Sequence, residues 1–439
     1  WGDYAGYEET NYSNWFSTGL SGNNWEYQSP NWSHNRKYTV WARVRDIAGN
    51  YSLGWSTNVF YFDAYSAVPE QPDSFTLTPA SGSAIAGLAS ISGTAIDNSL
   101  GGINNVKWVL WKEGNSWWDG NVWQLPPLPD YTGWPDPSII SPAGGINPTW
   151  TRNTLLPAPA DMTDGTTYYI ASNALDLVVN ASGAPDSNYE ITRSTIIFWW
   201  DGAEPESRTT APVSGSRYSS LSQLRGTASD VVKIDSLTIR IKRNSDNKYW
   251  NDAANDFNIA FATEAWVTIG TNISQRTTSW MYTDSFIWEN GAYDINIQAK
   301  DYLRYETDFT TVTFTYDLAS PTPVIDAPTS LGYINAPNNG LLPYTTAQGT
   351  IDTDASLVEV RLQDLQQGTT YWNETTKTWG PGVVWNTAVI YSPGYWRVLI
   401  SSTAYVNGRK YEFYVKGTDS SLPAANVGYS GTQRFWFDI

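Results

Sequence analysis

Residues 38–46, YTVWARVRD, carry the pattern from which the fold class can be predicted. Every second residue from Tyr38 to Val44 is apolar or aromatic, and mostly polar residues lie between them. This two-residue period is typical of a β-strand with one buried face. The same offset from tyrosine to aspartate recurs three more times, at Tyr168…Asp176, Tyr293…Asp301 and Tyr411…Asp419.

Three further motifs recur in a constant order around this one. A Phe-x-aromatic-Asp motif occupies 60–63, 198–201, 314–317 and 435–438. A Gly-Thr motif that ends in aspartate occupies 93–97, 226–230 and 349–352. An aromatic pair before Asp or Asn occupies 117–119, 249–251 and 371–373. Motifs repeated in one order indicate an internal repeat of one structural unit.

The aspartate that ends each Phe-x-aromatic-Asp motif sets the predicted boundaries. We expect half a module over 1–63, followed by complete modules over 64–201, 202–317 and 318–439. Either upstream residues or strands of another chain would complete the half module. The stretch 119–160 holds nine prolines, which remove ladder donors, so we expect an extended loop inserted in the second module.

The motif Tyr-x-Val-x-Ala-x-Val-x-Asp-Ile-Ala-Gly-Asn (38–50) and its looser copies resemble bacterial immunoglobulin-like repeat modules of the Big type, found in tandem in extracellular surface and adhesin proteins. With the short alternating strands, the resemblance implies an all-β fold: tandem antiparallel β-sandwiches that form an extended rod. It also implies a tyrosine corner, in which a tyrosine hydroxyl bonds back to the backbone. The residues implied are Tyr38, Tyr168, Tyr293 and Tyr411.

Repeated carboxylates are expected to gather where consecutive modules meet, because immunoglobulin-like modules bring the ends of strands B and F to the entry point of the chain. The expected groups are Asp63, Asp97 and Asp176; Asp201, Glu204, Asp230 and Asp301; and Asp317, Asp352, Asp354 and Asp419. Clustered carboxylates repel unless a cation bridges them, and calcium prefers such oxygen ligands. The alternative is that each aspartate caps its own loop as an Asx-turn.

The chain holds 24 tryptophans, more than the cores of a few sandwiches need. The densest group is Trp108, Trp111, Trp117, Trp118, Trp123 and Trp134. Three interpretations remain open for this group: local packing over the proline-rich insert, contact with a neighbouring chain, and carbohydrate binding.

Composition excludes several classes of protein. The chain has no cysteine and one histidine, His34, which excludes disulfides, thiol nucleophiles and multi-histidine metal sites. Its net charge of −17 argues against nucleic acid as a partner, and its apolar runs are too short for membrane insertion. No catalytic motif is present, so we expect no enzyme activity.

These observations predict a structural segment of a long extracellular or cell-surface repeat protein, such as a surface layer, fibre or adhesive stalk. Its expected partners are like copies or other surface proteins, with glycans as a further candidate. The alternative function is a set of carbohydrate-binding modules appended to an enzyme outside this segment. Calcium is the one candidate cofactor.

Overall fold

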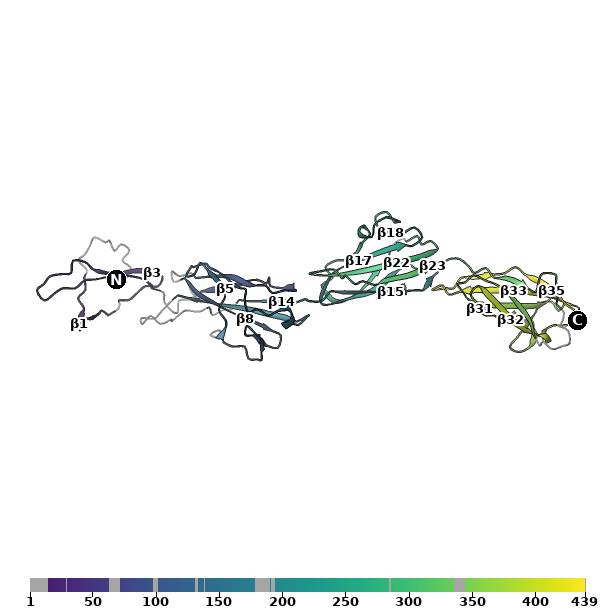
Figure 1. Ribbon diagram of the computed structural model, residues 1–439, viewed down its shortest axis with the longest axis horizontal. Coiled ribbons are helices and arrows are strands. Elements are labelled where there is room, and N and C mark those ends of the chain that lie inside the picture. Colours follow the sequence, from purple (N-terminus) through teal and green to yellow (C-terminus); the bar gives the residue numbers. More distant parts are fainter. Residues whose placement is uncertain are drawn as a thin grey trace. The chain divides into compact units, whose positions relative to one another are not determined.

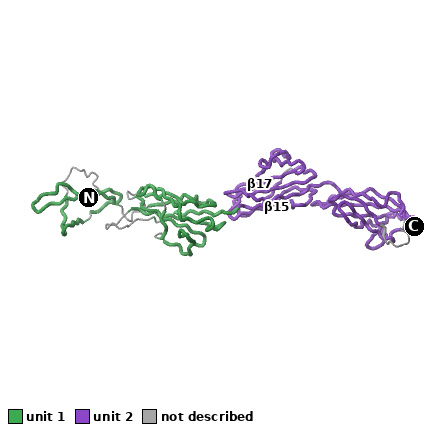
Figure 2. The backbone as a smooth tube through the Cα atoms, viewed as in Figure 1, with its two compact units in different colours: residues 1–203 green, residues 204–439 purple. Residues whose placement is uncertain are grey.

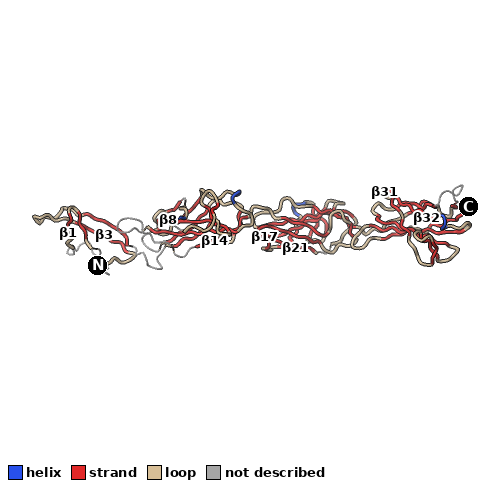
Figure 3. Tube along the Cα trace, turned by 90° about the horizontal axis from the view of Figure 1, so that it is seen from below, coloured by secondary structure: helices blue, strands red, loops and turns tan. Residues whose placement is uncertain are grey.

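The computed structural model describes residues 15–28, 30–62, 72–97, 102–130, 133–137, 139–177, 190, 194–283, 286–334 and 344–438. Regular structure in these residues is almost entirely β-strand (Figures 1 and 3). Their helical elements are three-residue 3-10 turns: η2 (Pro159–Asp161), η3 (Ala262–Glu264) and η4 (Ser402–Ala404). The predicted all-β class is confirmed. None of these turns has the length or hydropathy to cross a membrane.

The chain divides into two compact units, residues 1–203 and 204–439 (Figure 2). Strands of the first unit up to residue 62 form two separate antiparallel pairs. Here Tyr38 and Phe60 stack with ring centroids 5.7 Å apart and are only half-buried. The strands are β1 (Gly19–Ser21), β2 (Asn24–Glu26), β3 (Arg36–Ala42) and β4 (Ser56–Phe62).

The rest of the first unit is a sandwich of two sheets, which we call the second module. One sheet has the order β10-β9-β8-β13-β14-β6 and the other β11-β12-β7-β5. The strands are β5 (Asp73–Thr78), β6 (Ser83–Ile85), β7 (Ile91–Ile96), β8 (Ile103–Lys112), β9 (Trp117–Trp118), β10 (Trp123–Gln124), β11 (Ile139–Ser141), β12 (Thr149–Arg152), β13 (Thr167–Asp176) and β14 (Ser194–Trp200).

The second unit begins with the third module, whose central strand β17 belongs to two sheets. Its first half, from Leu224, pairs with β15 and β21, and its second half, from Ile234, pairs with β22. A register shift between Ser229 and Ile234 marks the change. The strands are β15 (Glu206–Ala211), β16 (Arg217–Tyr218), β17 (Leu224–Arg243), β18 (Lys248–Asn251), β19 (Asp256–Ile259), β20 (Val267–Gly270), β21 (Gln275–Tyr282), β22 (Gly291–Asp301) and β23 (Thr311–Tyr316).

The fourth module is again a sandwich, with sheets β24-β26-β32-β31 and β25-β35-β33-β27-β28-β29. Off this path, β30 pairs with β27 and β34 pairs with β33. Its strands are β24 (Val324–Ala327), β25 (Tyr333–Ile334), β26 (Tyr344–Thr350), β27 (Ala355–Asp364), β28 (Thr370–Asn373), β29 (Thr378–Gly380), β30 (Asn386–Thr387), β31 (Val389–Ser392), β32 (Tyr395–Ser401), β33 (Arg409–Asp419), β34 (Val427–Tyr429) and β35 (Gln433–Phe437).

One short strand in each of these three modules pairs in parallel, which the predicted antiparallel pattern does not include. The pairs are β6 with β14, β16 with β23, and β25 with β35. Each parallel strand lies at the edge of its sheet, so the antiparallel ladders elsewhere in the module are undisturbed.

Each complete module encloses its own hydrophobic core around the motif tyrosine. Tyr168, Tyr293 and Tyr411 are each 0% exposed. The hydroxyls of Tyr168 and Tyr411 accept the backbone N–H of the residue five positions earlier, at 2.7 Å. Tyr293 accepts the N–H of Glu289 at 3.0 Å, and Tyr38 accepts that of Ser33 at 2.9 Å. All four tyrosines therefore anchor a turn in the same way.

The expectation that 119–160 is a loop is wrong in part. Strand β12 lies inside this stretch and pairs with β7, so that Trp150 lies opposite Gly93 and is fully buried. Pro142 and Pro148 lie just outside β11 and β12, and the four residues of β12 keep their ladder N–H groups. Prolines here bound the strands instead of preventing them.

Candidate metal-binding carboxylate clusters

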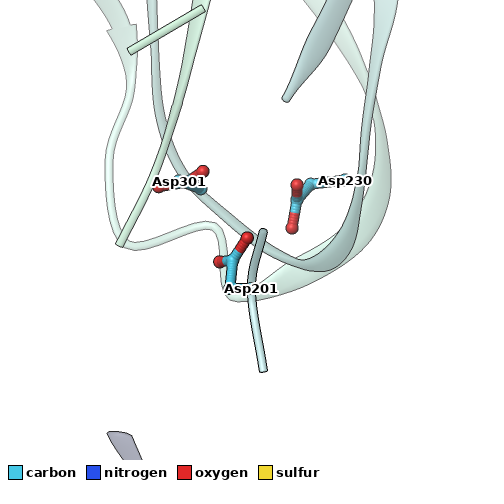
Figure 4. A group of neighbouring side chains, drawn as sticks. All are labelled: Asp201, Asp230 and Asp301. Atoms are coloured by element: carbon cyan, nitrogen blue, oxygen red, sulfur yellow. The ribbon is translucent and has the colours of Figure 1, made fainter. Parts of the chain in front are cut away.

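Two groups of three aspartates stand out among the described residues, each with carboxylate oxygens within 4.8 Å of one another. The group Asp201, Asp230 and Asp301 (Figure 4) is called the Asp230 cluster. The group Asp317, Asp354 and Asp419 is called the Asp419 cluster. Each contains the aspartate that ends a motif strand, β22 or β33.

In the Asp230 cluster, two aspartates of the second unit are each held through one oxygen by backbone N–H groups two and three residues further along the chain. Asp230 Oδ1 accepts the N–H groups of Val232 and Lys233, at 2.7 and 2.8 Å. Asp301 Oδ1 accepts those of Leu303 and Arg304, at 2.5 and 2.6 Å. The Oδ2 atoms of both aspartates are buried and accept no hydrogen bond. In each carboxylate, one oxygen is thus held by local backbone N–H groups, and the second oxygen accepts no hydrogen bond.

Burial dominates the electrostatics of this pair. Asp230 is 9% exposed and Asp301 is 0% exposed. Burial raises the pKa of Asp230, and the neighbouring Asp301 carboxylate raises it as well, although backbone hydrogen bonds oppose both effects. Arg304 Nε lies 3.8 Å from Asp301 Oδ2 without forming a hydrogen bond to it. Asp201, which follows β14 and is 0% exposed, is the third member. Buried carboxylates of this kind are suitable ligands for a hard cation.

The Asp419 cluster is built differently, because Asp419 has both oxygens occupied. Oδ1 accepts the N–H groups of Ser421 and Asn426, at 3.0 and 2.7 Å. Oδ2 accepts the Ser421 hydroxyl at 3.0 Å and the Asn426 side-chain amide at 2.8 Å. Burial raises the pKa of Asp419, but these hydrogen bonds outweigh burial, and the pKa is lowered.

An arginine completes the Asp419 cluster. Arg217 Nη1 lies 3.2 Å from Asp317 Oδ2 and 3.6 Å from Asp354 Oδ2. Burial raises the pKa of Asp354, and the Asp317 carboxylate raises it further, whereas Arg217 lowers it. Arg217 could not be identified from the sequence, because it lies in a two-residue strand outside all four repeated motifs.

Two acids of the expected groups lie outside the clusters. Asp352 accepts the N–H and hydroxyl of Thr322, at 2.6 and 2.7 Å. Glu204 accepts the same two groups of Thr307, at 2.8 and 2.7 Å. These two acids bond residues 30 and 103 positions away, so they are not the local Asx-turns of the alternative interpretation. Local bonds of that kind are made instead by Asp230 and Asp301.

The first expected group is not assembled within the described residues. Asp97 and Asp176 are buried after β7 and at the end of β13. Asp63, the third member, lies outside the described residues. A metal site at that position stays a prediction.

The tryptophan group divides by burial. Trp108 and Trp118 belong to the core of the second module, and Trp134 covers Val109 and Ala171 on the outer side of β8 and β13. These three pack locally and their side chains do not reach the surface. The interaction expectation stays a prediction for the half-buried members, Trp111, Trp117 and Trp123.

Two buried glutamates were missed in the sequence. Glu190 Oε2 accepts the Ser74 hydroxyl and the Ala174 N–H, at 2.5 and 3.1 Å. Glu306 bonds in the same way to the N–H groups of Ser207 and Ala299, at 2.9 and 3.0 Å. Each glutamate thus ties the first strand of its module to the tyrosine strand. Their distances from the preceding motif aspartate differ, so no constant spacing identifies them.

No family model matches the chain, and no curated protein matches its sequence. Similar solved structures include a tetra-tandem repeat in the extending region of a large adhesion protein, with 13% identity, a TM-score of 0.30, and coverage of 92% of this chain and 82% of that chain. A Ca²⁺-stabilised adhesin of an Antarctic bacterium has 13% identity, a TM-score of 0.27 and the same coverage. The chicken CNTN1 FN1–FN3 domains have 9% identity and a TM-score of 0.27, over 81% of this chain and 99% of that chain. Nothing about function follows from likenesses this low.

Proposed function

We propose that the chain is a structural segment of an extracellular or cell-surface repeat protein, in which tandem sandwich modules form an adhesive stalk or fibre. The modules are those set by the motif aspartates, over 64–201, 202–317 and 318–439. Partners would be like copies of the chain or other surface proteins. The segment would act by spacing and bearing load, without catalysis.

The observation that carries this proposal is the direct joint between the third and fourth modules. Leu422 N–H donates to the carbonyl of Arg217 at 2.9 Å, and Ser219 N–H donates to the carbonyl of Leu422 at 2.7 Å. The Asn426 side-chain amide donates to the carbonyl of Asp317 at 2.9 Å. The loop after β33 is therefore paired with β16 of the preceding module. Backbone pairing of this kind supports a fixed angle between consecutive modules, as a stalk requires.

Calcium is the proposed ligand of the Asp230 cluster. Asp230 Oδ2 and Asp301 Oδ2 are buried without a hydrogen bond, and Arg304 Nε, 3.8 Å from Asp301 Oδ2, supplies one positive charge against these two carboxylates. Calcium takes six to eight oxygen ligands at about 2.3–2.6 Å, so carboxylates, carbonyls and waters can all contribute. Bound calcium would favour the ionised form of Asp230 against burial and the neighbouring Asp301 carboxylate, which both raise the pKa of Asp230.

The alternative function, carbohydrate binding, would need exposed aromatic rings such as those of Tyr391 and Tyr395. Tyr391 and Tyr395 on β31 and β32 are each about half exposed, with ring centroids 6.2 Å apart. Their planes are tilted by 40°, so the pair is not a flat platform for successive sugar rings. A glycan array with the wild-type chain and Tyr391→Ala tests this alternative: binding lost in the variant would favour it.

Small-angle X-ray scattering of the full chain tests the proposed stalk. A single globule of this length has a radius of gyration of about 22 Å. We expect a much larger radius and an elongated distance distribution in calcium. A radius near the globular value, in calcium or in chelator, would exclude a stalk.

A further inference from the structure

We propose that Arg217 serves as a permanent, built-in cation at the joint between the third and fourth modules, so that this joint stays ordered without calcium. The inference deepens the proposed stalk function, on which it rests, by dividing the two carboxylate clusters into a metal-dependent one and a metal-independent one.

Arg217 occupies a position that each parallel edge strand provides. In the third module, Arg217 lies opposite Thr315 and Tyr218 opposite Tyr316. In the second module, Ala84 lies opposite Trp199 and Ile85 opposite Trp200. The next aspartate then donates its N–H to the edge strand in both: Asp317 to Tyr218, and Asp201 to Ile85. Ala84 is therefore the counterpart of Arg217, and it has no charge.

The guanidinium is placed to serve two carboxylates at once. Its Nη1 atom hydrogen-bonds to Asp317 Oδ2 at 3.2 Å and lies 3.6 Å from Asp354 Oδ2. The side chains of Asp317 and Asp354 are only 7% and 19% exposed, whereas that of Arg217 is 35% exposed. A charge shared at these distances, away from most of the solvent, offsets the repulsion between the two acids.

The remaining acid of this cluster has no free oxygen for a metal. A carboxylate offers about four lone-pair sites, and Asp419 fills them with hydrogen bonds from Ser421 and Asn426. Asp354 Oδ1 is the oxygen of this cluster that is buried without a hydrogen bond. To gain a second carboxylate ligand, a calcium ion would have to displace the hydrogen bonds of Asp419 or the Arg217 guanidinium. In the Asp230 cluster, the Oδ2 atoms of Asp230 and Asp301 are already available. Arg304 is the cation nearest to Asp301 there, but it lies 3.8 Å from Oδ2 with no hydrogen bond to it.

The joint depends on this arrangement because the same residues carry its backbone pairing. Arg217 supplies the carbonyl that accepts the Leu422 N–H, and Asp317 supplies the carbonyl that accepts the Asn426 amide. Asn426 in turn donates to Asp419. By offsetting the charges of Asp317 and Asp354, Arg217 therefore stabilises the joint between β16 and the loop after β33.

Amide hydrogen exchange of the full chain, with calcium or with chelator, tests the inference. In the wild type we expect protection of the Leu422 and Ser219 amides to be the same in both conditions. In Arg217→Ala, which introduces the counterpart residue, protection of these amides should fall by about tenfold or more. Arg217→Lys keeps the charge and should retain most of the protection. Arg208→Ala, which removes a solvent-exposed arginine paired with Glu206, is the matched control and should change nothing at the joint.

Two results would overturn the inference: unchanged joint protection in Arg217→Ala, or calcium-dependent protection of Leu422 and Ser219 in the wild type. Failure of the calcium proposal has a separate signature, which is unchanged protection of the Val232 and Leu303 amides when calcium is added. If calcium does not change protection at the Asp230 cluster, but the joint amides lose protection in Arg217→Ala, the role of Arg217 is still supported.

Discussion

The indole ring of Trp396 lies directly against the backbone of Gly349. A methyl group on Gly349 would come within 2.9 Å of the Trp396 ring and 1.8 Å of the Val324 carbonyl oxygen. The two residues are opposite one another in the pairing of β26 with β32, and Trp396 donates to the carbonyl of Thr350 at 3.1 Å. The same relationship joins Gly93 with Trp150 and Gly226 with Trp280. In each of these three modules, a tryptophan ring thus packs against the glycine of the repeated Gly-Thr motif.

Gly349→Ala should destabilise the fourth module by about 3 kcal/mol, because the added methyl group meets backbone and a packed ring that cannot both move. Urea unfolding of the full chain, followed by exchange of the β26 amides, measures this loss. Gly382→Ala is the matched control, since nothing lies within 4 Å of its added methyl group. Equal stability of the two variants would show that the glycine is not required by the tryptophan.

Tyr411→Phe should lower the free energy of unfolding of the fourth module by about 1 kcal/mol. The substitution keeps the buried ring and removes the hydroxyl that accepts the Val406 N–H, leaving that N–H without its acceptor. Tyr429→Phe is the control, because Tyr429 is 52% exposed and its ring stacking is preserved. Thermal melts of both variants compare the contributions of the two hydroxyls to stability. A loss of stability as large in Tyr429→Phe as in Tyr411→Phe would contradict a special role for the tyrosine corner.

Stability of the second module should decrease as the pH rises through neutrality. Burial raises the pKa of Glu190 from 4.5 to about 7, although hydrogen bonds from Ser74 and Ala174 oppose the shift. The folded state therefore binds this proton more tightly than the unfolded state. Its stabilisation is complete below pH 4.5 and is lost as the pH passes 7. Melting temperatures at pH 5 and pH 8 should differ in the wild type and differ less in Glu190→Gln. An identical pH dependence in both proteins would assign the effect to other groups.

Trp134→Ala should destabilise the second module by about 3 kcal/mol, since the ring is 3% exposed and covers Val109 and Ala171. Trp25→Ala, at a position 49% exposed, should cost much less. Calorimetric unfolding measures how much stability each of the two variants loses. A small effect at Trp134 would reopen the interpretation that this tryptophan serves a partner.

Asp230→Asn combined with Asp301→Asn should abolish calcium binding at the Asp230 cluster, because each substitution removes a buried anionic ligand. Isothermal titration calorimetry of the full chain measures the number of sites lost. Asp352→Asn is the control, because Asp352 lies outside both clusters and caps Thr322. Absence of calcium binding in the wild type would refute the metal assignment.

The sequence predicted the fold class well because a period of two and a repeated motif are properties of short segments. The strand β22, from Gly291 to Asp301, follows the predicted alternation closely. The continuity of strand β17 could not be predicted, because it depends on a register shift between Ser229 and Ile234 that no local pattern marks. Strand β12 was not predicted, because the prolines around it indicated a loop.

The candidate site was predictable to a similar extent. Asp301 and Asp419 lie at strand ends as expected, whereas Asp230 lies inside β17, and the structure brings Asp230 near Asp301 and Asp317 near Asp419. What distinguishes the two clusters could not be predicted, because it depends on which oxygen each loop occupies and on the placement of Arg217 against Asp317 across 100 residues.

Single-molecule force extension of the full chain in calcium tests most directly whether it is a string of separately folded, load-bearing modules. We expect successive unfolding events, one for each of the three cores, each lengthening the chain by the extended length of one module, about 380–500 Å, less the length of the folded module. A single event that releases most of the chain at once, or extension without resistance, would contradict it.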